Sequence, residues 1–187
     1  KINALFGAQD MTVGQPMSAL LKFSIPLLIG NLAQQMYSTV DSVIVGRYVG
    51  DKALSAIGTT LPIINLLLVL FMAVSTGAGI MVAQYYGAKA KESLSRSIGN
   101  AMTLVCVSSL VVMAIGIPLS GSLLRLTRTP VETFDMARSY LTIILWGVLG
   151  LGFYNIVSGI LRGLGNSVFP LLTLLLTSCL NIVLDIW

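Results

Sequence analysis

Histidine is absent from the 187 residues of this chain, and charged residues make up only 10% of it. The lack of His excludes His-based proton relays, His metal sites and Ser/His or Cys/His catalysis. The two cysteines, Cys106 and Cys179, lie in apolar runs, where a thiol is more often a packing residue than half of a disulfide. Soluble domains carry about 25% charged residues. With 56% hydrophobic residues and a mean hydropathy of +0.91, this composition predicts a polytopic membrane protein, and its diffuse net charge of +4 does not indicate nucleic-acid binding.

Apolar runs separated by short polar stretches predict five transmembrane helices, at residues 20–46, 54–82, 97–124, 139–161 and 169–187. The predicted fold class is therefore all-α, a transmembrane helical bundle over residues 20–187 that follows a cytoplasmic or interfacial segment over residues 1–19. Surface loops are expected over 84–92 and 125–138. The last run reaches Trp187 without a polar exit, so we expect the sequence to be part of a longer protein. With the N-terminus inside, six basic residues lie inside and five outside, so the positive-inside rule does not fix the orientation.

The first predicted helix carries a polar stripe. Its members, Asn31, Gln34, Ser38 and Asp41, recur at steps of three, four and three, which places them on one face of the helix. An ionisable side chain inside an apolar span is costly and indicates function by default. The stripe must face other protein or a water-filled cavity, and we expect the other helices to pack around it and form a transport path.

Asp41 and Asp185 are the two acids that lie within apolar spans. The first and fifth helices cross the bilayer in the same direction. Asp41 is about six residues, or about 9 Å, from Arg47 at the exit of its helix, and Asp185 is about four residues, or about 6 Å, from the expected exit of the fifth helix. The two carboxylates are therefore predicted at similar depth in the same half of the bilayer, with Asn181 one turn before Asp185 on the same face.

Two carboxylates and an amide in a site of low dielectric constant can bind a proton or a dehydrated Na⁺ through oxygen atoms. We therefore predict that Asp41, Asn181 and Asp185 form the coupling site, with H⁺ or Na⁺ as the coupling ion and no other cofactor or metal. Packing is the alternative role, because intramembrane Asp, Asn and Ser also hydrogen-bond helices together, and a Tyr near a helix end also fits an interfacial anchor. Five further polar residues are candidates for lining the cavity: Asn31, Gln34, Ser38, Tyr140 and Asn155.

Four segments resemble the multidrug and toxic compound extrusion (MATE) transporters. They are PLLIGNLAQQMYSTVDSVIVGRYVG over 26–50, LSAIG over 54–58, GAG over 77–79 with AQYYGA over 83–88, and LRGLGNS over 161–167. The resemblance extends from residue 11 to residue 187. It implies five helices of the six-helix N-terminal lobe of a twelve-helix antiporter, which exports cationic or amphipathic drugs against H⁺ or Na⁺. It also implies a multi-pass protein of the cytoplasmic membrane with a cytoplasmic N-terminus, and the bilayer, small amphipathic or cationic compounds and the C-terminal lobe as partners.

In relatives of that family an acid of helix one pairs with an Asn-x-x-x-Asp motif on helix five, which Asp41 and the segment NIVLD over 181–185 match. Tyr140 and Asn155 are similar to polar helix-four residues near that site. A lipid-linked saccharide flippase of the same superfamily is one alternative, although it would carry more basic residues in its cavity. A non-transporting helical subunit is another. An intramembrane enzyme would need a nucleophile with its base or a metal cluster, so the sequence predicts no enzyme.

Overall fold

The computed structural model describes residues 16–186, except for the side chains at 16, 18, 19, 22, 23, 185 and 186. Within this range the chain forms five α-helices and no strand. Three of them, α3, α4 and α5, are long and apolar enough to cross a membrane, and α6 is a shorter apolar helix. The predicted all-α fold is confirmed. The helices are α2 (Pro16–Tyr48), α3 (Asp51–Gly87), α4 (Lys91–Leu126), α5 (Val131–Gly163) and α6 (Val168–Ile186).

The helices extend beyond the predicted apolar spans at their polar ends. The largest difference is in α5, which begins at Val131 instead of near residue 139, so Glu132, Asp135 and Arg138 are helical and not in a loop. Pro130 precedes this helix with φ −58° and ψ 145°, an extended conformation from which the helix starts.

The connector predicted over 84–92 is also shorter in the structure. Residues 84–87 belong to α3 and residue 91 begins α4, which leaves a turn over 88–90. Residues 16–19 of the predicted N-terminal segment belong to α2, and residues 1–15 lie outside the described residues. Hydropathy marks the part of a helix that lies in hydrocarbon, whereas backbone hydrogen bonds continue into the polar interface, so apolar runs underestimate helix length.

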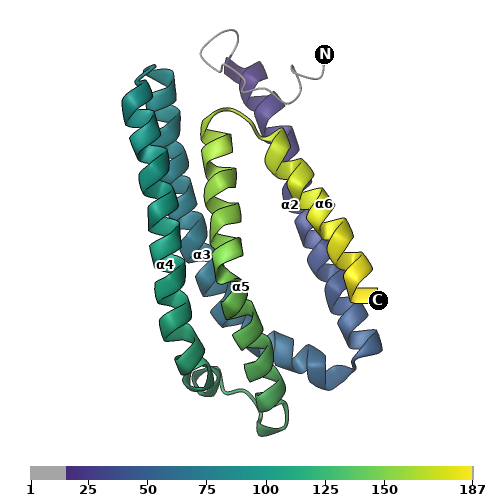
Figure 1. The fold of residues 1–187 in the computed structure, drawn as a ribbon. Coiled ribbons are helices and arrows are strands. Elements are labelled where there is room, and N and C mark those ends of the chain that lie inside the picture. Colours follow the sequence, from purple (N-terminus) through teal and green to yellow (C-terminus); the bar gives the residue numbers. More distant parts are fainter. Residues whose placement is uncertain (1–15, 187) are drawn as a thin grey trace.

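Short turns join successive helices and make each pair antiparallel. The turns cover 49–50, 88–90, 127–130 and 164–167. Each contains a residue with a left-handed φ, namely Gly50 (100°), Lys89 (55°), Arg128 (55°) and Gly165 (82°). Because four reversals separate them, α2 and α6 run in the same direction, as predicted, and they lie side by side (Figure 1).

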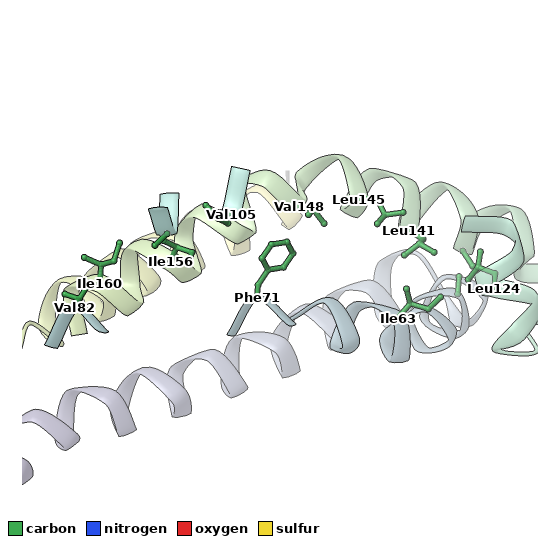
Figure 2. Close-up of a cluster of buried hydrophobic side chains, with 13 residues drawn as sticks. Ile63, Phe71, Val82, Val105, Leu124, Leu141, Leu145, Val148, Ile156 and Ile160 are labelled. Carbon is green, nitrogen blue, oxygen red and sulfur yellow. The ribbon is translucent and has the colours of Figure 1, made fainter. Parts of the chain in front are cut away.

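The apolar core lies among α3, α4 and α5. Phe71 of α3 is fully buried near the middle of the cluster, which runs along the length of these helices (Figure 2). In Figure 1, α3 bends in its first half, the half that contains Pro62, which lacks the backbone donor that a continuous helix needs. The labelled side chains of the cluster are Ile63, Phe71, Val82, Val105, Leu124, Leu141, Leu145, Val148, Ile156 and Ile160.

Small residues bring α3 and α5 into close contact. The Ser75 hydroxyl donates a hydrogen bond to the backbone carbonyl of Asn155. A Cβ atom added at Gly79 would lie 2.8 Å from the carbonyl oxygen of Gly159, and one added at Gly163 would overlap the carbonyl oxygen of Gly79. Glycine lets two helix backbones approach in this way, which fixes α5 against α3 and so positions the polar residues of α5.

Candidate functional site: a polar cavity beside α2

A cavity of about 180 Å³ lies between the first half of α2, the C-terminal half of α5 and the start of α6, with α3 behind them. Three of the predicted lining residues border it: Asn31 and Gln34 from α2, and Asn155 from α5. Its full lining is Pro26, Leu27, Gly30, Asn31, Gln34, Leu68, Met72, Leu151, Tyr154, Asn155, Ser158, Arg162, Ser167, Pro170, Leu171 and Leu174.

Asn155 is held in place by both its backbone and its side chain. Its carbonyl accepts the hydrogen bond from Ser75, and its Nδ2 donates to the carbonyl oxygen of Leu151 at 2.9 Å. This turn of α5 is therefore attached to α3, and the hydrogen bonds hold the Asn155 amide at the cavity wall.

Three further polar residues of α5 line the cavity and were not predicted to do so: Tyr154, Ser158 and Arg162. Tyr154, Ser158 and Arg162 recur at steps of four along α5 and Asn155 is adjacent to Tyr154, so the four residues share one side of the helix. That periodicity is present in the sequence. It was missed because the apolar run ends just before Arg162, which places this residue in a predicted turn instead of on a helix.

Asp41 lies about seven residues, or about 10 Å, beyond Gln34 on α2. Its side chain is half-buried, and its carboxylate is close enough to the half-buried Tyr140 of α5 for the two groups to interact electrostatically. Neither Tyr140 nor Ser38 is among the described residues of the cavity wall. Ser38 is exposed, and its hydroxyl donates a hydrogen bond to the Gln34 carbonyl oxygen at 3.1 Å. Asp41 and Tyr140 thus form a second polar location, separate from the cavity.

The packing of α6 on α2 determines where Asp185 lies along the bundle relative to Asp41. A Cβ atom added at Gly30 would contact Leu171 at 3.4 Å and Leu174 at 3.8 Å. Because the two helices run in parallel, moving eleven residues along both brings position 41 to the same height as positions 182–185. The backbone of Asp185 is therefore at the depth of Asp41. Its side chain lies outside the described residues, so a contact between the two carboxylates stays a prediction.

Asn181 is half-buried, and its Oδ1 atom is buried without a hydrogen-bond partner among the described residues. Leaving a buried acceptor unpaired costs about 1–3 kcal/mol, so such an oxygen favours a hydrogen-bond donor or a cation beside it. An amide oxygen can accept a hydrogen bond from a protonated carboxyl group, and amide and carboxylate oxygens both coordinate a hard cation such as Na⁺. Among the described side chains no group of three His, Cys, Asp or Glu residues gathers.

The sequence model of the MatE family matches residues 26–187 of this chain. The chain belongs to the MatE family. This MatE chain is 32% identical over 177 residues to the probable multidrug resistance protein YpnP of Bacillus subtilis (strain 168), over 95% of the chain and 40% of that relative. It is 30% identical over 162 residues to the probable multidrug resistance protein YoeA of the same organism, over 87% of the chain and 35% of that relative.

Solved structures agree with this assignment. The MatE chain superposes with a TM-score of 0.87 and 28% identity on an outward-facing multidrug resistance MATE family transporter of the MOP superfamily, over 96% of this chain and 39% of that one. The MatE chain thus spans about two-fifths of the length of these relatives. Membership of the family confirms the resemblance in the four sequence segments, the helical membrane fold and the prediction that the chain is not an enzyme.

Proposed function

We propose that this chain forms the N-terminal lobe of a cation-coupled exporter, an antiporter that moves drugs and other xenobiotic organic cations across the cell membrane in exchange for H⁺ or Na⁺. One observation carries the proposal: the polar face of α2 borders the cavity at Asn31 and Gln34 and reaches the half-buried Asp41 two turns later. A cavity for a substrate and an acid for an ion then share one helix. Binding at one location changes binding at the other when the two ligands favour different positions of that helix.

Asp41 is the group that we expect to take up the coupling ion, with Asn181 and Asp185 of α6 as its partners. Burying the negative charge of a carboxylate is costly unless a cation compensates it. We therefore expect the site to bind H⁺ or Na⁺ when it is open to water, before it closes. The unpaired Oδ1 of Asn181 supports this assignment, because it offers an acceptor at the level of positions 37–40 of α2. The only cofactor-like species that the proposal requires is the coupling ion.

The remaining partners follow from the length of the relatives. Because the chain spans about two-fifths of their length, we expect a C-terminal lobe of the same full-length protein to complete the path. We further propose that the protein is a multi-pass protein of the cytoplasmic membrane with its N-terminus on the cytoplasmic side, and that its cargo consists of small amphipathic or cationic compounds and not nucleic acid.

Export by the full-length protein in proteoliposomes tests the proposal. Transport of ethidium, a fluorescent cation, is followed under a pH gradient or a Na⁺ gradient imposed separately, and we expect one gradient to drive it. Asp41→Asn and Asp185→Asn should each abolish the driven transport. Asp51→Asn is the matched control, because Asp51 is an exposed carboxylate in the first turn of α3, and it should transport normally. Transport by Asp41→Asn at the wild-type rate would show that this acid only packs helices together.

A lipid-linked saccharide flippase is the second candidate, and the presence of Arg162 in the cavity wall favours it. Such a substrate carries phosphate groups that a guanidinium can bind. A flippase would leave ethidium unmoved under either gradient, so the same experiment separates the two candidates.

A further inference from the structure

Arg162 is the one cation among the described residues that line the cavity, and that lining contains no acid. The side chain is half-buried. Among the described residues, Arg96 and Glu92 form the ion pair, and no described carboxylate lies within salt-bridge distance of Arg162. Tyr154 is the ionisable residue of the cavity wall that interacts electrostatically with Arg162. The charge of this wall is therefore positive, opposite to that of the Asp41 location.

The cavity lining also contains apolar side chains. Arg162 lies in the last turn of α5, next to the turn that holds Ser167, and Leu68 and Met72 of α3 and Leu151 of α5 are among the apolar residues of the same lining. A guanidinium in a partly desolvated site binds a carboxylate or a phosphate through two parallel hydrogen bonds. Apolar side chains beside it remove a hydrocarbon body from water.

The size of the cavity limits the ligand. An engineered apolar cavity of about 150 Å³ holds one benzene molecule. The cavity here, at about 180 Å³, therefore accommodates an anionic group with one small ring system or a few carbon atoms, and a larger ligand would extend beyond this lobe.

We propose that Arg162 provides a subsite for the anionic group of an amphiphile, a carboxylate or phosphate joined to an apolar body that lies along Leu68, Met72 and Leu151. The subsite lies in the cavity assigned above to the exported compound, so it rests on the proposed function for its biological cargo. It extends that function from cations to compounds that also carry, or only carry, a negative group. Arg162 also stands in the last turn of a helix, where a cation compensates the helix dipole; that role predicts no ligand selectivity.

Equilibrium binding to the full-length protein in phosphatidylcholine nanodiscs tests the subsite. The probes are tritiated 1-naphthylacetate and its neutral methyl ester, which share the ring and differ in the negative charge. After subtraction of binding to empty nanodiscs, we expect the protein to bind the acid at least about tenfold more tightly than the ester, because a charge-assisted hydrogen bond contributes that much. Arg162→Gln should remove the preference, and Arg162→Lys should keep part of it because it retains the charge without the planar fork.

Arg96→Gln is the matched control, since Arg96 is exposed and paired with Glu92 and lies outside the cavity wall; it should bind both probes as the wild type does. Adding phosphatidylglycerol to the nanodiscs identifies the source of the anion. Displacement of the acid assigns the subsite to a lipid headgroup, and no displacement assigns it to a diffusible amphiphile. Equal affinity of the wild type for acid and ester, or an undiminished preference in Arg162→Gln, would overturn the proposal. No ion gradient is used in this binding assay, so a failure of coupled transport is distinguishable from a failure here.

Discussion

Replacing Gly159 with alanine should separate α5 from α3 and destabilise the lobe. A Cβ atom built at this position would overlap the Ser75 hydroxyl and would lie 2.5 Å from the backbone carbonyl oxygen of Ser75. The hydroxyl already donates to the carbonyl of Asn155, and a backbone oxygen cannot rotate away, so the helices themselves must move. Gly159 is thus a position where the close approach of two backbones requires glycine.

The magnitude follows from two opposing effects. Overpacking a well-packed contact costs typically about 1–3 kcal/mol, and the upper end applies because backbone atoms overlap. Alanine in place of glycine inside a helix recovers about 1 kcal/mol of helix propensity. We therefore expect Gly159→Ala to lower the free energy of unfolding by about 2 kcal/mol.

Gly147→Ala supplies the matched control in the same helix. Gly147 is exposed, and an added Cβ atom would meet nothing within 4 Å, so only the gain in helix propensity remains. Unfolding of the full-length protein in mixed micelles, titrated with SDS and followed by far-UV circular dichroism, gives both free energies. The Gly147→Ala variant should be as stable as the wild type or slightly more stable. If Gly159→Ala were equally stable, the close contact between α3 and α5 would not exist.

Two further substitutions probe local features by the same titration. Ser109→Ala should leave the stability unchanged or raise it by about 1 kcal/mol, because the buried Oγ of Ser109 has no hydrogen-bond partner among the described residues; a loss of more than about 1 kcal/mol would reveal a partner. Gly50→Ala should cost about 1–3 kcal/mol although an added Cβ atom would meet nothing within 4 Å, since the φ of 100° at this turn is unfavourable for any residue with a side chain. Gly58→Ala, with equally open surroundings inside α3, is the control for Gly50→Ala and should not destabilise.

Hydropathy and periodicity were enough to predict the helical membrane fold, the common direction of α2 and α6, and the placement of Asn31 and Gln34 on one face of α2. These properties are local: a run of apolar residues fixes a helix of membrane length, and a step of three to four residues fixes a face, whatever the rest of the chain does. The helices were predicted too short for a related reason. Hydropathy does not detect the polar turns that extend α5 back to Val131, because their stability comes from backbone hydrogen bonds.

Packing between helices was needed for the site itself. The sequence places Asn31 and Gln34 on one face but contains no signal that α5 presents Asn155, Ser158 and Arg162 to the same cavity. That meeting depends on the close contact of α5 with α3 and on the register of α6 against α2, which arise from side chains far apart in the chain. One helix therefore determines its own faces, and only the assembled bundle determines which of those faces enclose a common space.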